Sequence, residues 1–76
     1  MLVKIYYFNE DWDDEVYECK DMPDVVATAQ YDTFAFITHD NKKIEGDVDY
    51  KELVCDAVNN TVYYEIHLTD CATVNI

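Results

Sequence analysis

An excess of negative charge constrains this chain more than any other feature of its sequence. Seventeen acidic residues stand against five lysines and no arginine, which gives a formal net charge of −12 at pH 7. Half of the 76 residues are nevertheless hydrophobic, and 14% are aromatic. Because acidic disordered segments are poor in such residues, the composition predicts a folded chain that keeps its carboxylates at the surface. The length predicts a single domain over residues 1–76.

The sign of the charge selects the class of partner. Proteins hold nucleic-acid backbones through lysine and arginine, and an acidic surface repels polynucleotides and anionic membranes at long range. We therefore expect no direct binding of nucleic acid and no membrane association. The expected partner is a protein with a basic surface.

The cysteines and the first residues indicate a compartment. Cys19, Cys55 and Cys71 form an odd set without a C-x-x-C pair, and residues 1–8 are too short and too aromatic for a signal peptide. No stretch approaches the ~20 apolar residues of a membrane span. Since cytoplasmic thiols stay reduced, these features predict a cytoplasmic protein with free cysteines.

Alternating apolar residues predict most of the strands. The predicted strands are residues 2–8, 16–19, 33–38, 43–45, 61–68 and 71–76. A turn at Thr69-Asp70 is expected to separate the last two. The inward positions of these two strands are expected to be Val62, Tyr64, Ile66, Leu68, Ala72, Val74 and Ile76.

Two segments carry apolar residues at helical spacing. In residues 22–31, Pro23 suits a first helical turn. Residues 48–58 carry a longer apolar stripe of Tyr50, Leu53, Val54, Ala57 and Val58. Two αββ units after a leading hairpin predict an α+β domain in the order ββ-αββ-αββ, with both short helices packed on an antiparallel sheet.

The negative charge gathers in two segments. The first surrounds Trp12 and contains Glu10, Asp11, Asp13, Asp14, Glu15 and Glu18. The second contains Glu45, Asp47, Asp49, Glu52 and Asp56, of which the last three would form a row about 10 Å long on the predicted helix. A net charge of magnitude about 2–8 already keeps a small domain soluble, and more charge destabilises it by self-repulsion. Both segments, with Trp12 as an apolar anchor, are therefore the predicted partner-binding residues.

No combination of residues predicts an enzyme. The candidate thiolate–imidazole pairs are His67 with Cys71, and His39 with Cys19 or Cys55. The surrounding negative charge would raise the pKa of each thiol and so disfavour the reactive thiolate. Carboxylates are too abundant to mark one catalytic pair. We therefore expect a protein without catalytic residues.

No spacing predicts a metal site or another cofactor. Structural zinc sites use closely paired Cys and His residues, which this sequence lacks. A calcium-binding EF-hand loop needs Gly at position 6 and Glu at position 12, and a loop that starts at Asp11 places Val16 and Met22 there. We expect no bound cofactor.

In size, composition and its two acidic segments the chain resembles the small acidic inhibitors that phages and mobile elements use against host defence nucleases, the anti-CRISPR and anti-restriction proteins. The resemblance includes no sequence motif, and these inhibitors share no common fold. It implies a non-enzymatic mechanism in which carboxylates imitate the phosphates of a duplex. The protein would then occupy the basic DNA- or RNA-binding groove of a nuclease effector, such as a CRISPR-Cas effector, in the host cytoplasm.

Two other functions are compatible with the same sequence. The chain could be a general protein-interaction module whose acidity serves only solubility, or a small metal-responsive protein. Crowding of the carboxylates also predicts raised carboxyl pKa values, so that the domain would gain stability from pH 8 toward pH 5.

Overall fold

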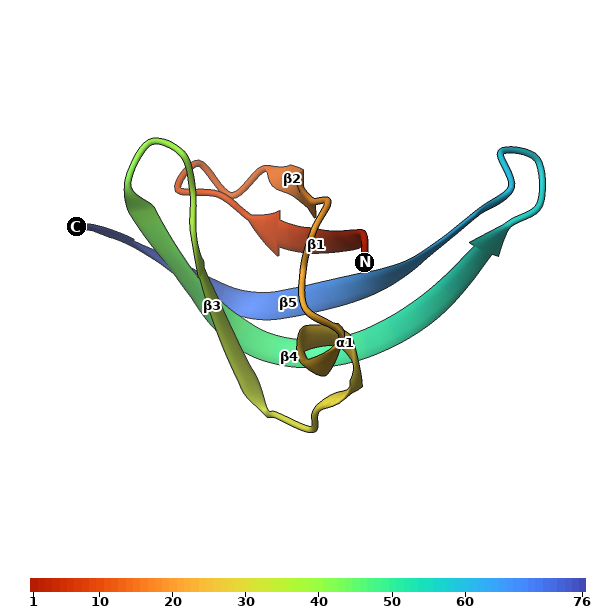
Figure 1. Ribbon diagram of the computed structural model, residues 1–76. Helices are drawn as coiled ribbons and strands as arrows, with labels where there is room; N and C mark the ends of the chain where they lie inside the picture. Colours follow the sequence, from red (N-terminus) through yellow and green to blue (C-terminus); the bar gives the residue numbers. More distant parts are fainter.

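A computed structural model describes all 76 residues as one five-stranded sheet with a single short helix (Figure 1). The elements are β1 (Val3–Phe8), β2 (Asp14–Cys19), α1 (Asp24–Thr28), β3 (Thr33–Ile37), β4 (Lys42–Asp56) and β5 (Thr61–Asn75). The strands lie in the order β2-β1-β5-β4-β3. Because β1 and β5 are parallel while every other neighbouring pair is antiparallel, the sheet is mixed.

The predicted α+β domain with two helices on an antiparallel sheet is wrong. Strands make up 62% of the chain and helix only 7%. The helix predicted over residues 22–31 shortens to α1. Its Val25, Val26 and Thr28 are β-branched, and such side chains lose rotamer freedom in a helix.

The helix predicted over residues 48–58 does not form, and an irregularity in β4 explains the error. Residues up to Asp56 continue β4, and residues 57–60 make the turn to β5. The register of β4 against β5 shifts between Val48 and Tyr50. The shift moves the inward positions from even to odd residue numbers. The alternation expected of a strand is therefore broken, and the apolar residues fall at a spacing close to that of a helix.

A second irregularity lies on β5 and removes the turn predicted at Thr69-Asp70. Beyond the Asp47–Thr69 pair, β5 contains one extra residue relative to β4, and Asp70 has a φ of 51°. The chain continues as one strand whose inward positions change. Cys71 packs on the core, whereas Val74, which was expected to face inward, is 46% exposed.

The other strand predictions are confirmed, except that residues 43–45 are only the beginning of the much longer β4. Residues 2–8 and 16–19 lie in the β1–β2 hairpin, and residues 33–38 supply β3. Residues 61–68 form the first half of β5, where Ile66 and Leu68 are buried as expected.

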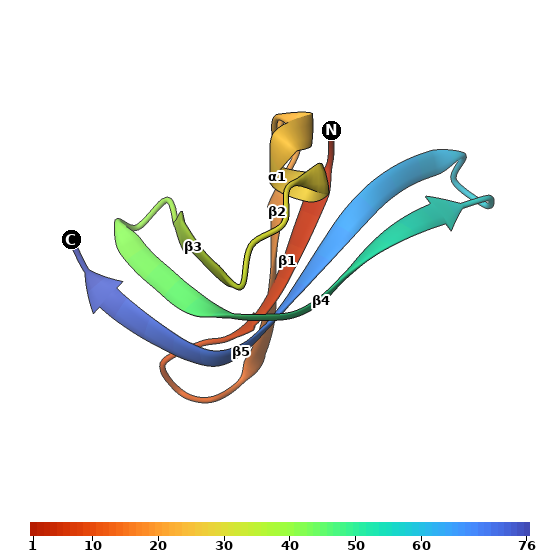
Figure 2. The ribbon, with the colours of Figure 1, turned by 90° about the horizontal axis from the view of Figure 1, so that it is seen from below.

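The core lies on one face of the sheet, which we call the inner face. Val3, Ile5 and Ile66 are fully buried there, on the two central strands. Around them pack Tyr7, Phe36, Ile44 and Leu68. Figure 2 shows β4 and β5 bent into an arch, with α1 and β3 on its concave side. The two register irregularities account for the bend, since an extra residue kinks the strand that carries it.

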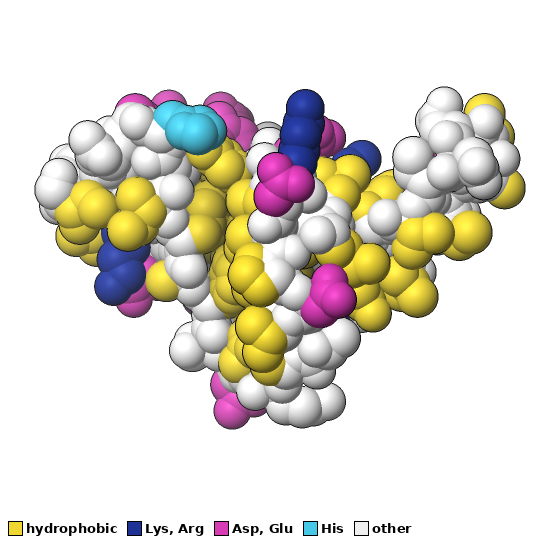
Figure 3. All heavy atoms as spheres, viewed as in Figure 1, with side chains coloured by type: hydrophobic (Ala, Val, Ile, Leu, Met, Phe, Trp, Pro, Cys, Tyr) yellow, Lys and Arg dark blue, Asp and Glu magenta, His cyan; other side chains and the backbone are white.

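The β4–β5 hairpin reaches beyond the rest of the sheet. β1 pairs with β5 only as far as Tyr64, and β3 leaves β4 after Asp47. Residues 53–63 therefore project as a two-stranded arm (Figures 1 and 2). On the inner face of this arm, Leu53 and Val62 are 56% and 49% exposed, and hydrophobic side chains are visible along it in Figure 3.

Gly46 is the chain's one glycine, and on β4 it lies close against Thr69 and Cys71 of β5. A Cβ atom at this position would come within 3.0 Å of the Thr69 carbonyl oxygen and 3.1 Å of the Cys71 Sγ. We expect Gly46→Ala to push the strands apart and to lower the free energy of unfolding by about 1–3 kcal/mol. Urea denaturation followed by circular dichroism measures this change.

The neighbouring exposed residue supplies the control. Glu45→Ala should change the free energy of unfolding by no more than about 0.5 kcal/mol. A Gly46→Ala variant as stable as the parent chain would contradict the close approach of the two strands.

Candidate functional site

The ladder register gathers many of the predicted binding residues on the outer face, the side of the sheet opposite the core. This face carries alternate residues of β2, β1, β5 and β4, and its acidic members from the predicted set are Asp14, Glu18, Glu45, Asp47, Glu52 and Asp56. On the side drawn in Figure 3, where α1 lies in front, hydrophobic side chains run down the middle, and acidic ones appear along the upper edge and singly below it. Half of the predicted binding residues thus share the outer face of the sheet.

The row of Asp49, Glu52 and Asp56 predicted on a helix face does not exist, because these residues belong to β4. Asp49 lies within the register shift between Val48 and Tyr50, and Glu52 is paired across the ladder with Glu65. Glu52 and Asp56 share the outer face, but the shift at Asp49 breaks the regular spacing that the predicted row required.

Asp56 holds the turn between β4 and β5. One carboxylate oxygen, Oδ1, accepts hydrogen bonds from the backbone N–H groups of Val58 at 3.0 Å and Asn59 at 3.1 Å. Its Oδ2 accepts a bond of 2.9 Å from the Asn59 side-chain amide. These bonds, that of the Asn59 side chain above all, lower the pKa of Asp56. The residue therefore has a structural role in addition to its place on the outer face.

The loop between β1 and β2 is organised by Asn9. Its Oδ1 accepts the backbone N–H groups of Asp11 at 2.8 Å and Asp13 at 3.0 Å, and its amide donates to Glu15 at 3.0 Å. Trp12 lies at the tip with a φ of 62°, and its side chain is 75% exposed. The loop therefore presents an aromatic ring among carboxylates. The sequence reasoning missed Asn9, although asparagine before a tight loop is a known turn signal.

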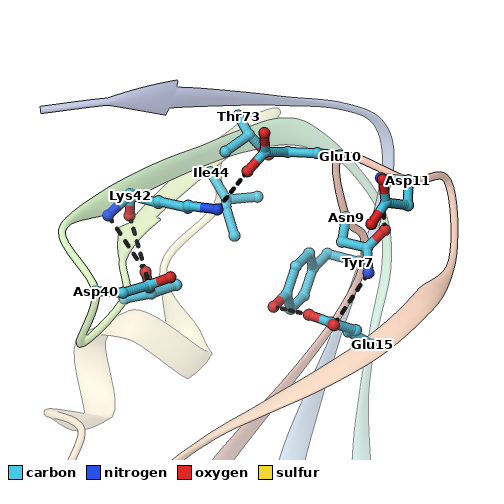
Figure 4. Close-up of a pocket in the computed structure, with 10 residues that line it drawn as sticks. Tyr7, Asn9, Glu10, Asp11, Glu15, Asp40, Lys42, Ile44 and Thr73 are labelled. Atoms are coloured by element: carbon cyan, nitrogen blue, oxygen red, sulfur yellow. Dashed lines mark hydrogen bonds and ion pairs between the residues drawn. The ribbon is translucent and has the colours of Figure 1, made fainter.

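Behind this loop lies a polar cavity of about 350 Å³, which we call the acidic hollow (Figure 4). Four carboxylates line it, and the β3–β4 segment adds one ammonium group. The acidic residues are Glu10, Asp11, Glu15 and Asp40, and the basic one is Lys42. The Lys42 Nζ lies 2.5 Å from the Glu10 Oε1, which raises the pKa of Lys42. Because one lysine faces four carboxylates, the hollow has a net negative charge. Asp40 and Lys42 were not among the predicted binding residues.

Uncharged donors stabilise the carboxylates of the hollow. The Tyr7 hydroxyl donates to Glu15 at 2.5 Å, which lowers the pKa of Glu15, while burial and this bond raise the pKa of Tyr7. The Thr38 hydroxyl donates to Asp40 and lowers its pKa. Raised carboxyl pKa values were expected from crowding. The carboxyl pKa values that clearly shift, those of Glu15, Asp40 and Asp56, are all lowered, because specific hydrogen bonds outweigh the repulsion.

Three stacked rings cross the outer face from β1 through β5 to β4. The His67 ring lies 4.4 Å from that of Tyr6 and 4.1 Å from that of Tyr50, with interplanar angles of 2° and 13°. Glu65 accepts a hydrogen bond from the Tyr6 hydroxyl at 3.1 Å and lies 2.9 Å from the His67 Nε2. The inward positions expected for residues 61–68 leave His67 facing outward, and it does lie on the outer face. The stack itself depends on the register and could not be predicted.

The structure does not assemble the thiolate–imidazole pairs considered from the sequence. No hydrogen bond joins a histidine to a cysteine, and His39 lies against the ring of Tyr17 at 5.8 Å. All three cysteines are free, and burial raises the pKa of the Cys19 thiol. No group of three or more His, Cys, Asp or Glu side chains is arranged to hold a metal ion.

Comparison of the chain with protein-family models, with curated proteins and with solved structures finds no match. The structure contains no helix that is both long and apolar enough to cross a membrane.

The lowered pKa values predict a loss of stability in acid. A carboxyl group whose pKa is lower in the folded than in the unfolded chain stabilises the fold above its ordinary pKa, and this contribution disappears as the pH falls through the folded pKa. The ordinary values are 4.5 for Glu15 and 3.8 for Asp40 and Asp56. We expect the melting temperature to decrease as the pH is lowered below about 5.

Glu15→Gln should weaken this pH dependence, because the variant has no carboxyl group to protonate beside Tyr7. Asp13→Asn is the matched control, since the Asp13 side chain accepts no hydrogen bond. Melting curves recorded between neutral pH and acid compare the two. Equal slopes for both variants would contradict the role of the Tyr7–Glu15 bond.

Proposed function

We propose that the protein is a non-enzymatic acidic inhibitor that mimics nucleic acid and occupies the basic DNA- or RNA-binding groove of a nuclease effector, such as a CRISPR-Cas effector. One observation carries the proposal. Of the 17 acidic side chains, only Glu10, Glu18 and Glu45 have a lysine within 4.0 Å. The fold therefore leaves most of its negative charge available to a partner.

The density of charge is in the range that a nucleic-acid groove accepts. The longest axis of the protein is 36 Å. A duplex of that length carries about 21 phosphate charges, counting one per ~1.7 Å of axis. The net charge of −12 is a little over half of that number. A basic groove that binds a duplex would thus encounter a negative electrostatic potential of similar order on this protein.

The β1–β2 loop and the outer face are the parts that we assign to the interface. The loop supplies Asp11 and Asp13 beside the exposed ring of Trp12. Asn9 fixes the loop backbone, so little conformational freedom is lost when it binds. Aromatic side chains are frequent among the residues that dominate binding energy, which makes Trp12 the apolar anchor among charged contacts.

The proposed mechanism requires attraction of the protein to a basic groove and exclusion of nucleic acid from that groove. It requires no chemical step. Long-range attraction between opposite charges raises the association rate with a basic groove. Carboxylate–arginine pairs that lose their water in the complex then fix the orientation of the inhibitor. Because inhibitor and nucleic acid would occupy the same groove, neither can bind while the other is present.

Paired neutralising variants test the assignment of the loop. Asp11→Asn with Asp13→Asn removes two charges beside Trp12, whereas Asp21→Asn with Asp24→Asn removes two charges near α1. The assay measures DNA cleavage by a Cas9-type or restriction nuclease that the parent protein inhibits. We expect the loop variant to inhibit this nuclease about fivefold less well. The α1 variant should lose less than about twofold. Equal losses would contradict a localised interface, and tight binding of the protein to a nuclease already filled with its DNA would contradict the mimicry.

The arm favours one alternative function. Leu53 and Val62 expose apolar surface on its inner face, which suits a general protein-interaction module whose acidity serves solubility. The two functions respond differently to salt, because ionic screening weakens charge pairs while apolar docking is nearly insensitive to it. An affinity that stays constant between low and high salt, and that Leu53→Ser abolishes, would favour the alternative.

A further inference from the structure

A recess opens on the outer face where β1 and β5 separate. Their parallel pairing ends at Tyr6 and His67, so that Phe8 has no partner on β5. Beyond this point the strands leave a half-open cavity of about 620 Å³, bounded on one side by β2 and on the other by the register shift of β4. We call it the aromatic recess. Its lining includes Tyr6, Phe8, Tyr50, His67, Asp14 and Asp49.

The rings of the recess are held in place before anything binds. Tyr6, His67 and Tyr50 form the three-ring stack, and Glu65 fixes the polar atoms of the first two. Tyr50 lies at one end of the stack and is 48% exposed. One face of its ring is therefore covered by His67 while the exposed part of the residue is open to a guest.

The two aspartates of the recess have no partner of their own. Neither Asp14 nor Asp49 has a cationic group within 4.0 Å, and neither side chain makes a hydrogen bond. The third acidic residue at the recess, Glu15, is engaged by Tyr7 and Asn9. Asp14 and Asp49 come from β2 and β4, on the two sides of the cavity.

Aromatic faces beside free carboxylates select a planar cation. An anion would be repelled by both aspartates. An apolar guest would remove water from the two carboxylates without replacing its hydrogen bonds. A lysine ammonium is a strongly hydrated point charge, whereas a guanidinium is planar, stacks on aromatic rings and offers five N–H donors. A quaternary ammonium also binds aromatic rings, but it has no N–H group to donate to two carboxylates. Arginine is the guest that uses both halves of the recess.

We propose that the aromatic recess binds an arginine side chain of a protein partner, with the guanidinium on the Tyr50 ring and its N–H groups donating to Asp14 and Asp49. The inference rests on the proposed function, because it names the side chain that a basic groove would insert. It concerns a different part of the surface from the Trp12 loop, so each can fail separately.

Two short peptides test the recess directly. One contains five lysines, and in the other the central lysine is replaced by arginine, so that both carry the same charge. Titration of the protein, followed by NMR of backbone amides and aromatic ring protons, should show the arginine peptide binding roughly fivefold more tightly. Its selective shifts should fall on Phe8, Tyr50 and His67. Equal affinity of the two peptides, or no ring shifts at millimolar peptide, would overturn the proposal.

Matched variants locate the preference. Tyr50→Leu should remove the advantage of arginine, whereas Tyr63→Leu, on the same face but outside the recess, should keep it. Asp14→Asn with Asp49→Asn should reduce the preference more than Asp11→Asn with Asp13→Asn, although both pairs lose the same charge. Circular dichroism confirms that each variant is folded. A preference that survives Tyr50→Leu would overturn the assignment.

Further outcomes distinguish arginine recognition by the recess from binding of a small molecule and from the proposed inhibitor function. Arginine amide alone should bind more weakly than the peptide, and equal affinity would overturn the assignment of the guest to a protein. If both peptides bind with equal affinity and salt weakens the binding of both equally, arginine recognition by the recess is refuted. The proposed function as an acidic inhibitor is then unaffected. If the arginine preference is found but no nuclease is inhibited, the proposed function fails and the recess remains.

Discussion

The parallel pairing of β1 with β5 is the contact on which the rest of the structure depends. It joins the beginning of the chain to its last third and places Val3, Ile5 and Ile66 in the fully buried centre of the core. Apolar burial is the dominant favourable term in folding, and a domain of this size has one small core to supply it. The same pairing fixes the register, and the register decides which side chains face outward. The acidic outer face is thus a consequence of how the core is assembled.

The fold stabilises its carboxylates mainly without neutralising them. Asn9, Tyr7, Thr38 and Asn59 all donate hydrogen bonds from uncharged groups to acidic side chains or arrange the acidic loop. A lysine that donated to these carboxylates would instead have cancelled their charge. Hydrogen bonds to a carboxylate favour its ionised form. The protein therefore combines an ordered surface with a large net charge, which a decoy for a polyanion requires.

The sequence was informative where alternation was regular and failed where the strands are irregular. β1 and the first half of β5 follow from period-two patterns that the structure repeats. β4 was taken for a helix because the shift near Asp49 changes the parity of its inward residues, and no local signal marks such a shift. The expected orientation of Val74 failed for the same reason at Asp70. The fold class was wrong chiefly because residues 48–56 continue β4 instead of forming the second predicted helix.

The candidate site shows the same division. The loop from Glu10 to Asp13 could be predicted from composition, since charge near a turn lies at the surface. The ring stack and the aromatic recess could not, because they join residues of three or four strands and depend on a ladder that the sequence does not specify. The positions of Asp40 and Lys42 in the acidic hollow could not be predicted either, because they depend on how the β3–β4 segment packs beside the β1–β2 loop.

The projecting arm has one more consequence. From Asp49 to Asp56 one edge of β4 has no neighbouring strand, and the same holds for β5 at residues 61–63. An unpaired edge is a template on which another copy can add its own strand and begin a fibre. Electrostatic repulsion between molecules of net charge −12 opposes that encounter. The acidity thus also acts as a safeguard against self-assembly, and the safeguard vanishes as the surroundings approach the isoelectric point near pH 4.1.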